Sequence, residues 1–354
     1  MKLKKFFAGV VAAAMMLTVG ATAAFATVGT TTPVTNDGSG TFTITKKYTA
    51  ENDNTFAPAE TFKLQQTAKS GKQMSASYGS TVPDLNTVSG ENKGIVGVVS
   101  FTAEASGEQT GSFTIGLPKY EGVGVFTYTL EEVSATNAGI LNDGRKFTVT
   151  VYATQGENGI ETGVTVHENT DKNSKVDSIN NKFQAGALTI HKDVKGSMGD
   201  KAYQFPFTVT LSSAKPVTAK LRVNGEESNV TFTKASEDAT KYTATFNFNL
   251  SDDGNYTIGN IPYGVDYVVS EDGESGNKLT VGSGENAVEY AVAYNNNNGA
   301  IEGASATATV TNTAGNAIID TGVILDNAPY IALLAIVAIG GVALVLNKRR
   351  RDEE

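Results

Sequence analysis

Apolar and polar side chains alternate along many stretches of the chain. The pattern is clearest in residues 42–45, 146–151, 207–211 and 242–248, where Phe, Ile, Val, Leu, Tyr or Ala alternates with Thr, Asn or Lys. A period of two is typical of a half-buried β-strand, and aromatic and β-branched residues favour strands. Gly, Asn and Asp separate the stretches, and helical periodicity is scarce. The pattern predicts an all-β fold of the sandwich type.

Two polar segments predict tight connections between strands. Residues 142–144 have the sequence Asn-Asp-Gly, and residues 252–255 have the sequence Asp-Asp-Gly-Asn. Both predict hairpin turns, since these residues adopt the backbone angles that such turns require. Calcium loops are the alternative, but neither segment continues at the spacing of calcium ligands.

The alternating pattern also repeats along the chain. An apolar strand ending in Lys, an aromatic strand ending in Glu and a closing strand ending in Asn occur twice, in that order: residues 42–46, 126–132 and 179–181, then residues 188–192, 265–271 and 310–312. The first closing strand is followed by Gln184, Ala185 and Gly186. We therefore expect two tandem domains, at residues 27–184 and 185–314.

A polar side chain continues the core-facing row of every repeated strand. Positions i, i+2 and i+4 of a strand share a face, which places these groups in phase with apolar neighbours. They form two ordered sets: Lys46, Glu132 and Asn181, then Lys192, Glu271 and Asn312. A single Lys at the end of a strand usually extends its amine to water. Two complete sets in phase with the core are harder to explain in that way.

The chemistry of these side chains points to a covalent link. Burial favours the uncharged forms of Lys and Glu, and lowering a Lys pKa from ~10.4 to about 7 corresponds to roughly 4.6 kcal/mol. A neutral buried amine is a nucleophile, while a protonated Glu polarises an amide carbonyl. The Asn carboxamide then loses ammonia. Each set is therefore expected to form an intramolecular isopeptide bond, with Glu132 or Glu271 moving protons.

Both ends of the chain carry export signals. Lys2, Lys4 and Lys5 precede an apolar stretch, and small residues flank a cleavage site before Thr27, so residues 1–26 predict a signal peptide. At the other end, residues 330–346 form an apolar run of about 26 Å, followed by a basic cluster at 348–351. Residues 323–354 therefore predict a membrane-spanning segment with a cytoplasmic basic tail.

The amino-acid composition argues against several classes of function. The net charge is −9, which argues against nucleic-acid binding. There is no cysteine, so an exported chain must be stabilised by other means than disulfides. The only histidines are His167 and His191, and no metal spacing or nucleophile motif is present. We expect no metal, no cofactor and no enzyme with turnover, because each Lys-Glu-Asn set reacts once, with itself.

These motifs resemble the backbone pilins of Gram-positive bacteria, of the streptococcal T-antigen type. The resemblance rests on residues 188–192 with Gly196 and Asp200, on residues 261–271, and on the two closing Asn residues. It implies two in-line Ig-like (CnaB-type) β-sandwich domains, each closed by a Lys–Asn isopeptide bond formed beside a Glu. The bonds implied are Lys46–Asn181 with Glu132 and Lys192–Asn312 with Glu271. Glu131 is the competing neighbour of Glu132, and strand alternation favours Glu132.

The resemblance also implies assembly by a sortase. Residues 315–322 hold the region of the sorting motif, with Thr321 as the acyl donor and cleavage before Gly322. The motif keeps Thr-Gly but has Ile319 where the family usually has proline, which indicates a class-specific pilin sortase. The acceptor implied on the next subunit is Lys175, with Lys172 as the alternative.

The resemblance further implies a secreted protein of the cell surface and cell wall, held in the membrane before sorting. Its partners would be identical subunits in a covalent homopolymer, minor pilins and peptidoglycan. A monomeric sortase-anchored adhesin is the alternative function. The two differ in whether an acceptor lysine joins one subunit to the next.

Overall fold

The computed structural model describes residues 34–52, 55–73, 82–103, 106–157, 159–170, 175–176, 178–228 and 230–315. Within these ranges the chain is built from β-strands, with one 3-10 turn, η1 (Gly284–Asn286), and no α-helix. The all-β fold class predicted from the alternating pattern is confirmed. The predicted signal peptide, most of the sorting region and the predicted membrane segment lie outside the described residues.

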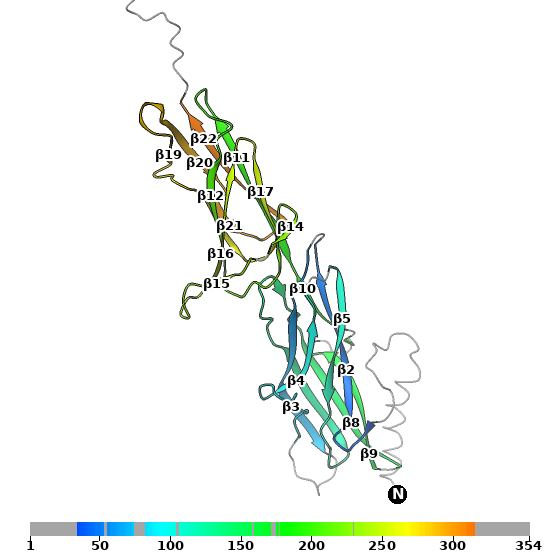
Figure 1. The fold of residues 1–354 in the computed structure, drawn as a ribbon. Coiled ribbons are helices and arrows are strands. Elements are labelled where there is room, and N and C mark those ends of the chain that lie inside the picture. The colour runs from blue at the N-terminus through cyan, green and yellow to red at the C-terminus, as the bar shows by residue number, and fades with distance from the viewer. Residues whose placement is uncertain are drawn as a thin grey trace, which may run out of the picture.

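The N-terminal half of the described chain forms two sheets that enclose one core (Figure 1). The six-stranded sheet has the order β1 (Val34–Thr35), β9 (Gly159–Glu168), β8 (Lys146–Gly156), β6 (Gly124–Glu132), β3 (Glu60–Gln73) and β4 (Ile95–Phe101). The four-stranded sheet has the order β5 (Glu108–Gly116), β2 (Thr41–Ala50), β10 (Ser178–Phe183) and β7 (Ile140–Leu141).

The C-terminal half repeats this plan with two further sheets. The seven-stranded sheet has the order β14 (Glu226–Ser228), β13 (Leu221–Val223), β17 (Asn255–Pro262), β11 (Ala185–Lys195), β22 (Ser305–Ala314), β20 (Val288–Asn295) and β19 (Lys278–Val281). The five-stranded sheet has the order β15 (Thr233–Lys234), β16 (Tyr242–Leu250), β12 (Phe205–Ser213), β18 (Asp266–Glu271) and β21 (Asn298–Ala300). The two sandwiches lie end to end, which makes the molecule elongated (Figure 1).

Parallel pairing occurs once in each sandwich, between its first long strand and its last. Strand β2 pairs with β10, and β11 pairs with β22; the other named strand pairs of the described chain are antiparallel. Alternate residues of β2 are buried, from Phe42 to Ala50, because one face of the strand covers the core. The same alternation runs along β11. The strands that begin and end each sandwich are therefore neighbours in the sheet.

The two predicted hairpins are wrong. The strand before Asn142 is β7, in the four-stranded sheet, whereas the strand after it is β8, in the six-stranded sheet. The segment at residues 252–255 likewise leads from β16 to β17, which belong to different sheets. Turn-forming residues indicate where the chain reverses, but the strand partner is chosen by packing. Both segments cross from one face of a sandwich to the other.

Candidate isopeptide sites

The first predicted set meets inside the N-terminal sandwich. Lys46 lies on β2 and Asn181 on the parallel neighbour β10, where Asn181 is the register partner of Tyr48. The Lys46 Nζ atom lies 2.6 Å from Asn181 Oδ1. Glu132 comes from β6, in the opposite sheet, and its Oε1 atom lies 2.5 Å from the same amine. The amine is thus held between the carboxyl group and the carboxamide.

These three polar groups are closed off from water. Lys46 and Asn181 have no exposed surface, and the side chain of Glu132 has none either. The Phe62 ring centre is 4.4 Å from Lys46 Nζ, and Glu132 Oε2 has no hydrogen-bond partner. A lone charge in such a place is strongly disfavoured, so the groups depend on one another for their polar contacts.

Burial shifts both ionisable groups of this set toward their neutral forms. It lowers the pKa of Lys46 to about 8, although the carboxyl of Glu132 pulls in the opposite direction. Burial also raises the pKa of Glu132 above its usual range, against the effect of Lys46. The two shifts converge, which makes it easier for a proton to pass from the ammonium to the carboxylate. The neutral amine needed for nucleophilic attack becomes accessible near neutral pH.

The second predicted set also gathers inside the C-terminal sandwich, but there the Asn contacts the Glu, and Lys192 Nζ has no hydrogen-bond partner among the described residues. Lys192 lies on β11, Asn312 on β22 and Glu271 on β18 of the opposite sheet. Glu271 Oε1 is 3.3 Å from Lys192 Nζ and accepts a hydrogen bond of 2.9 Å from Asn312 Nδ2. Lys192 and Asn312 have no exposed surface, and the Phe205 ring centre is 4.5 Å from the amine. Burial lowers the pKa of Lys192 to about 8 and raises that of Glu271.

The strand register at the two sites is the same. Asn181 pairs with the residue two positions after Lys46, and Asn312 pairs with Val194, two positions after Lys192. Side chains two apart on one strand face the same way, so each Lys and Asn point into one core. Each Glu faces them from the other sheet. The structure therefore brings together all six residues predicted from the sequence.

Glu131, the neighbour of Glu132, points away from this site. Its side chain is one-third exposed, and its Oε1 atom lies 2.7 Å from Lys146 Nζ on the outer face. The Lys146 amine, followed by Thr67, lowers the pKa of Glu131 by hydrogen bonding. Strand alternation thus separates an outer ion pair from a buried proton carrier, although the two glutamates are adjacent in sequence.

The residues predicted to join subunits are only partly described. Lys175 is exposed and lies before β10, so the inward alternation of that strand does not extend to it. It forms an isolated antiparallel bridge with His167. Lys172, Thr321 and Gly322 lie outside the described residues. In the part of the chain that the structure describes, no helix is long and apolar enough to cross a membrane, and no three His, Asp or Glu side chains gather as metal ligands.

Two contacts at the first site were not predicted from the sequence. The Asp143 backbone N–H donates a 3.0 Å hydrogen bond to Asn181 Oδ1, and Asn142 Oδ1 lies 3.4 Å from Asn181 Nδ2. The Asn-Asp-Gly sequence marks the position of both contacts, although its residue types predict a hairpin turn. At the second site, Glu271 donates its backbone N–H to the Tyr294 hydroxyl, a contact that strand alternation does not reveal.

Comparison with known proteins agrees with this architecture. Residues 42–184 match the family model described as a Spy0128-like isopeptide containing domain, and residues 186–314 match a domain of unknown function, DUF7601. A curated pilin of Streptococcus pyogenes serotype M1 is 28% identical over 249 residues, which are 69% of this chain and 73% of that protein.

Solved structures of pilins are also similar. The major pilin protein T-13 of Streptococcus pyogenes is 20% identical, with a TM-score of 0.48, and the match covers 77% of this chain and 97% of that one. Another major pilin of Streptococcus pyogenes is 21% identical, with a TM-score of 0.44, and the match covers 78% of this chain and 99% of that one.

The fold and the buried Lys-Glu-Asn sets define a tandem β-sandwich protein of the isopeptide-domain class. Residues 42–184 match the Spy0128-like isopeptide containing domain, and the chain is similar to a curated streptococcal pilin over 69% of its length.

Proposed function

We propose that this protein is a pilin, a structural backbone subunit of a cell-surface pilus, and that two internal isopeptide bonds stiffen it. The observation that carries the proposal is the meeting of a buried Lys, Glu and Asn between the first and last long strands of both sandwiches. Such a bond fixes the two strands through which the chain enters and leaves each sandwich.

The bond-forming step follows from the positions of the atoms. Neutral Lys46 Nζ attacks Asn181 Cγ, and the Nζ–Cγ bond forms as the Cγ–Nδ2 bond breaks. Glu132 takes a proton from the attacking nitrogen and gives a proton to the departing one, which leaves as ammonia. Lys192, Glu271 and Asn312 react in the same way. Each set turns over once, so the protein modifies itself without being an enzyme.

Intact mass tests the two bonds directly. Each bond releases one ammonia, so the folded protein should be about 34 Da lighter than its sequence, or about 17 Da per bond, a covalent change that the sequence does not encode. Glu132→Ala should be only about 17 Da lighter than its own sequence, because the first set loses its proton carrier while the second set still forms its bond. Glu131→Ala is the matched control and should keep both losses. A wild-type mass equal to that of the plain sequence would refute both bonds.

The joining of subunits is a separate part of the proposal. A sortase would cut between Thr321 and Gly322 and pass the Thr321 acyl group to Lys175 of the next subunit, which forms a homopolymer that ends on minor pilins or peptidoglycan. Exposure of Lys175 supports this assignment, since the enzyme must reach the amine. The basic tail would hold the subunit in the membrane until it is cut.

Cell-wall extracts test the polymer. The wild type should give a ladder of covalent oligomers, whereas Lys175→Ala should give monomers with both internal bonds intact. Lys172→Ala, the nearby alternative, should keep the ladder. Loss of the ladder in Lys172→Ala alone would move the acceptor to Lys172, and a single wild-type band would favour the monomeric adhesin instead.

A further inference from the structure

The crossing segment at residues 142–145 lies directly against the Asn181 carboxamide. Strand β7 ends at Leu141, which pairs with Lys182, so the chain leaves the sheet next to Asn181. The Asp143 backbone N–H then donates to Asn181 Oδ1 at 3.0 Å. On the other side of the same carboxamide, Asn142 Oδ1 lies 3.4 Å from Asn181 Nδ2. Both ends of the reacting amide therefore contact this one segment.

The Asp143 carboxylate anchors the segment to β10. Its Oδ2 atom accepts the backbone N–H of Asn180 at 2.9 Å, and its two oxygens accept hydrogen bonds from the Arg145 guanidinium. Arg145 in turn donates to the Ser178 carbonyl at 2.8 Å. The Asp143 side chain is only 6% exposed. These contacts fix the Asp143 N–H relative to the strand that carries Asn181.

Asn142 is anchored as well. Its Oδ1 atom accepts a 2.9 Å hydrogen bond from the Ala135 backbone N–H, so it is already held when it faces Asn181 Nδ2. Charged side chains anchor one end of the segment, and a backbone donor anchors the other. A preorganised donor of this kind requires little rearrangement when charge develops on its acceptor.

We propose that residues 142–145 are a positioning device for the first isopeptide bond, with the Asp143 N–H acting as an oxyanion donor; this inference rests on the proposed function. When Lys46 Nζ adds to Asn181 Cγ, the carbonyl π electrons move onto Oδ1, and the Asp143 N–H stabilises that negative charge. Asn142 Oδ1 accepts from Nδ2 and orients it as the leaving group. Glu132 carries the proton from Nζ to Nδ2, ammonia leaves, and the carbonyl re-forms.

The second site lacks this device. Asn312 lies beside the full strand β20, where it pairs with Val292, and no crossing segment replaces that strand. Among the described residues, Asn312 Oδ1 has no hydrogen-bond partner. The Lys and the Asn are in the same strand register at both sites. The two sites of one molecule can therefore be compared, and the Lys46–Asn181 bond should form faster than the Lys192–Asn312 bond.

Refolding of chain that has not yet folded, recovered in denaturant and with the mass of the plain sequence, provides the test. Peptide mapping follows the loss of about 17 Da at each Lys–Asn pair with time, while circular dichroism follows folding. In the wild type, the Lys46–Asn181 bond should form at least about tenfold faster than Lys192–Asn312, since removal of one oxyanion donor typically costs about 100- to 1,000-fold in rate. Equal rates, or a faster second bond, would overturn the inference. If neither bond forms, the proposed function itself fails.

Two variants separate positioning from mere folding. Asp143→Ala should slow the first bond at least about tenfold and leave the second unchanged, because the N–H loses its anchor. Asn142→Ala keeps the Asp143 contacts and should slow the first bond by a smaller factor. In both, bond formation should lag behind folding. If the first bond forms at its wild-type rate in a variant that folds, the inference is wrong. If Asp143→Ala does not fold, the rate of the first bond in Asn142→Ala provides the same test.

Asp252→Ala is the matched control. Asp252 is also a carboxylate of a crossing segment, and it accepts hydrogen bonds from Val194 N–H and Lys201 Nζ. Its backbone N–H, however, donates to the Lys201 carbonyl and not to an isopeptide Asn. This substitution should leave both rates within about twofold of the wild type. A large effect on the second bond would indicate that any loosened crossing segment slows the reaction, and would remove the specific role given to Asp143.

Discussion

At the scale of single residues, burial shifts ordinary side chains toward the neutral forms that the proposed reaction needs. Lys46 and Glu132 are both closed to water, and the pKa of each moves toward the other. In the form that attacks, Lys is neutral and Glu is protonated. In the ion pair, Lys is an ammonium and Glu is a carboxylate. The Lys–Glu pair shares one titratable proton in both forms. The two forms therefore stay in a fixed ratio as long as the pair holds one proton.

The rate of bond formation should consequently follow a bell-shaped pH profile. Above about pH 8, the pKa to which burial lowers Lys46, the pair loses its last proton and Glu132 has none to give. Below the raised pKa of Glu132, the pair holds two protons and the amine is blocked. The rate should fall up to about tenfold per pH unit outside these limits. The rate at which mass is lost during refolding, measured at a series of pH values, gives this profile.

A steady rise with pH would contradict this expectation. That result would mean that only the neutral amine matters and that the carboxyl group carries no proton in the reaction. The second bond provides a replicate, since burial also lowers the pKa of Lys192 to about 8.

At the scale of elements, the proposed bond would reinforce the short parallel pairing of β2 with β10. Strand β10 has six residues and pairs with β2 over residues 178–183. Lys46 and Asn181 are 135 positions apart, so their link closes a long loop. In the chain-entropy model, a disulfide around such a loop is worth about 5 kcal/mol. Such a link would also resist reduction, which suits a chain without cysteine.

Removal of the bond without leaving a lone buried charge should reveal this contribution. In Lys46→Leu with Glu132→Leu, both charged groups become apolar, which is close to neutral for packing. The free energy of unfolding of the N-terminal sandwich should still fall by about 5 kcal/mol. Unfolding in guanidinium chloride measures this change in the free energy of unfolding. Lys47→Leu with Glu131→Leu changes the outward-facing neighbours and should leave the midpoint nearly unchanged; an equal loss in both pairs would exclude the cross-link as the cause.

The strands and the phase of their side chains could be predicted from the sequence, but the contacts around them could not. Alternation placed Lys46 and Glu132 on core faces because a strand has only two faces. It said nothing of which strands pair, so the segment after Leu141 was expected to form a hairpin although it crosses between sheets. The Asp143 N–H is invisible to such patterns, because every residue has a backbone N–H and only the fold decides where it points.

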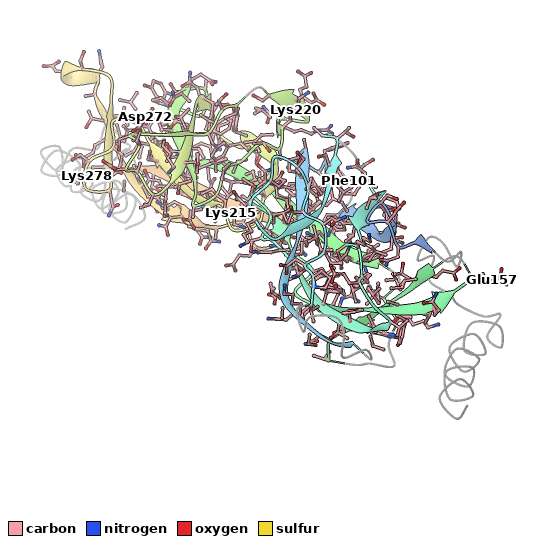
Figure 2. The ribbon with its side chains drawn as sticks, turned by 90° about the horizontal axis from the view of Figure 1, so that it is seen from below. Phe101, Glu157, Lys215, Lys220, Asp272 and Lys278 are labelled. Carbon is pink, nitrogen blue, oxygen red and sulfur yellow. The ribbon has the colours of Figure 1, made fainter. Side chains whose placement is uncertain are left out.

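At the scale of the whole molecule, the two sandwiches are joined by polar contacts as well as by the chain. Asn260 of β17 bonds both the N–H and the carbonyl of Phe56 at 3.0 Å, and the Arg222 guanidinium lies 3.6 Å from the centre of the Phe56 ring. On another side, Lys215 Nζ donates to the Ala135 carbonyl at 3.1 Å. Figure 2 shows Lys215 near the middle of the molecule, with Glu157 and Lys278 toward opposite ends.

Tension along the molecule would then follow the covalent links instead of the strands. A pull on both ends passes from Lys46 to Asn181, along the short connection to Lys192, and on to Asn312. Residues between each Lys and its Asn carry no load. In force spectroscopy on a single molecule held near residue 41 and residue 315, the wild type should therefore show no unfolding step before the attachment breaks.

Glu132→Ala should add one long step to that force trace. Without the first bond, the N-terminal sandwich can unravel, and the 135 positions between Lys46 and Asn181 extend by about 450 Å at roughly 3.4 Å per residue. The C-terminal sandwich should still not extend, and Glu131→Ala should behave like the wild type. A step of this length in the wild type would show that the load reaches the strands, which would contradict a cross-linked backbone. Absence of the step in Glu132→Ala would mean that the bond forms without its proton carrier, and intact mass of the same sample would identify that case.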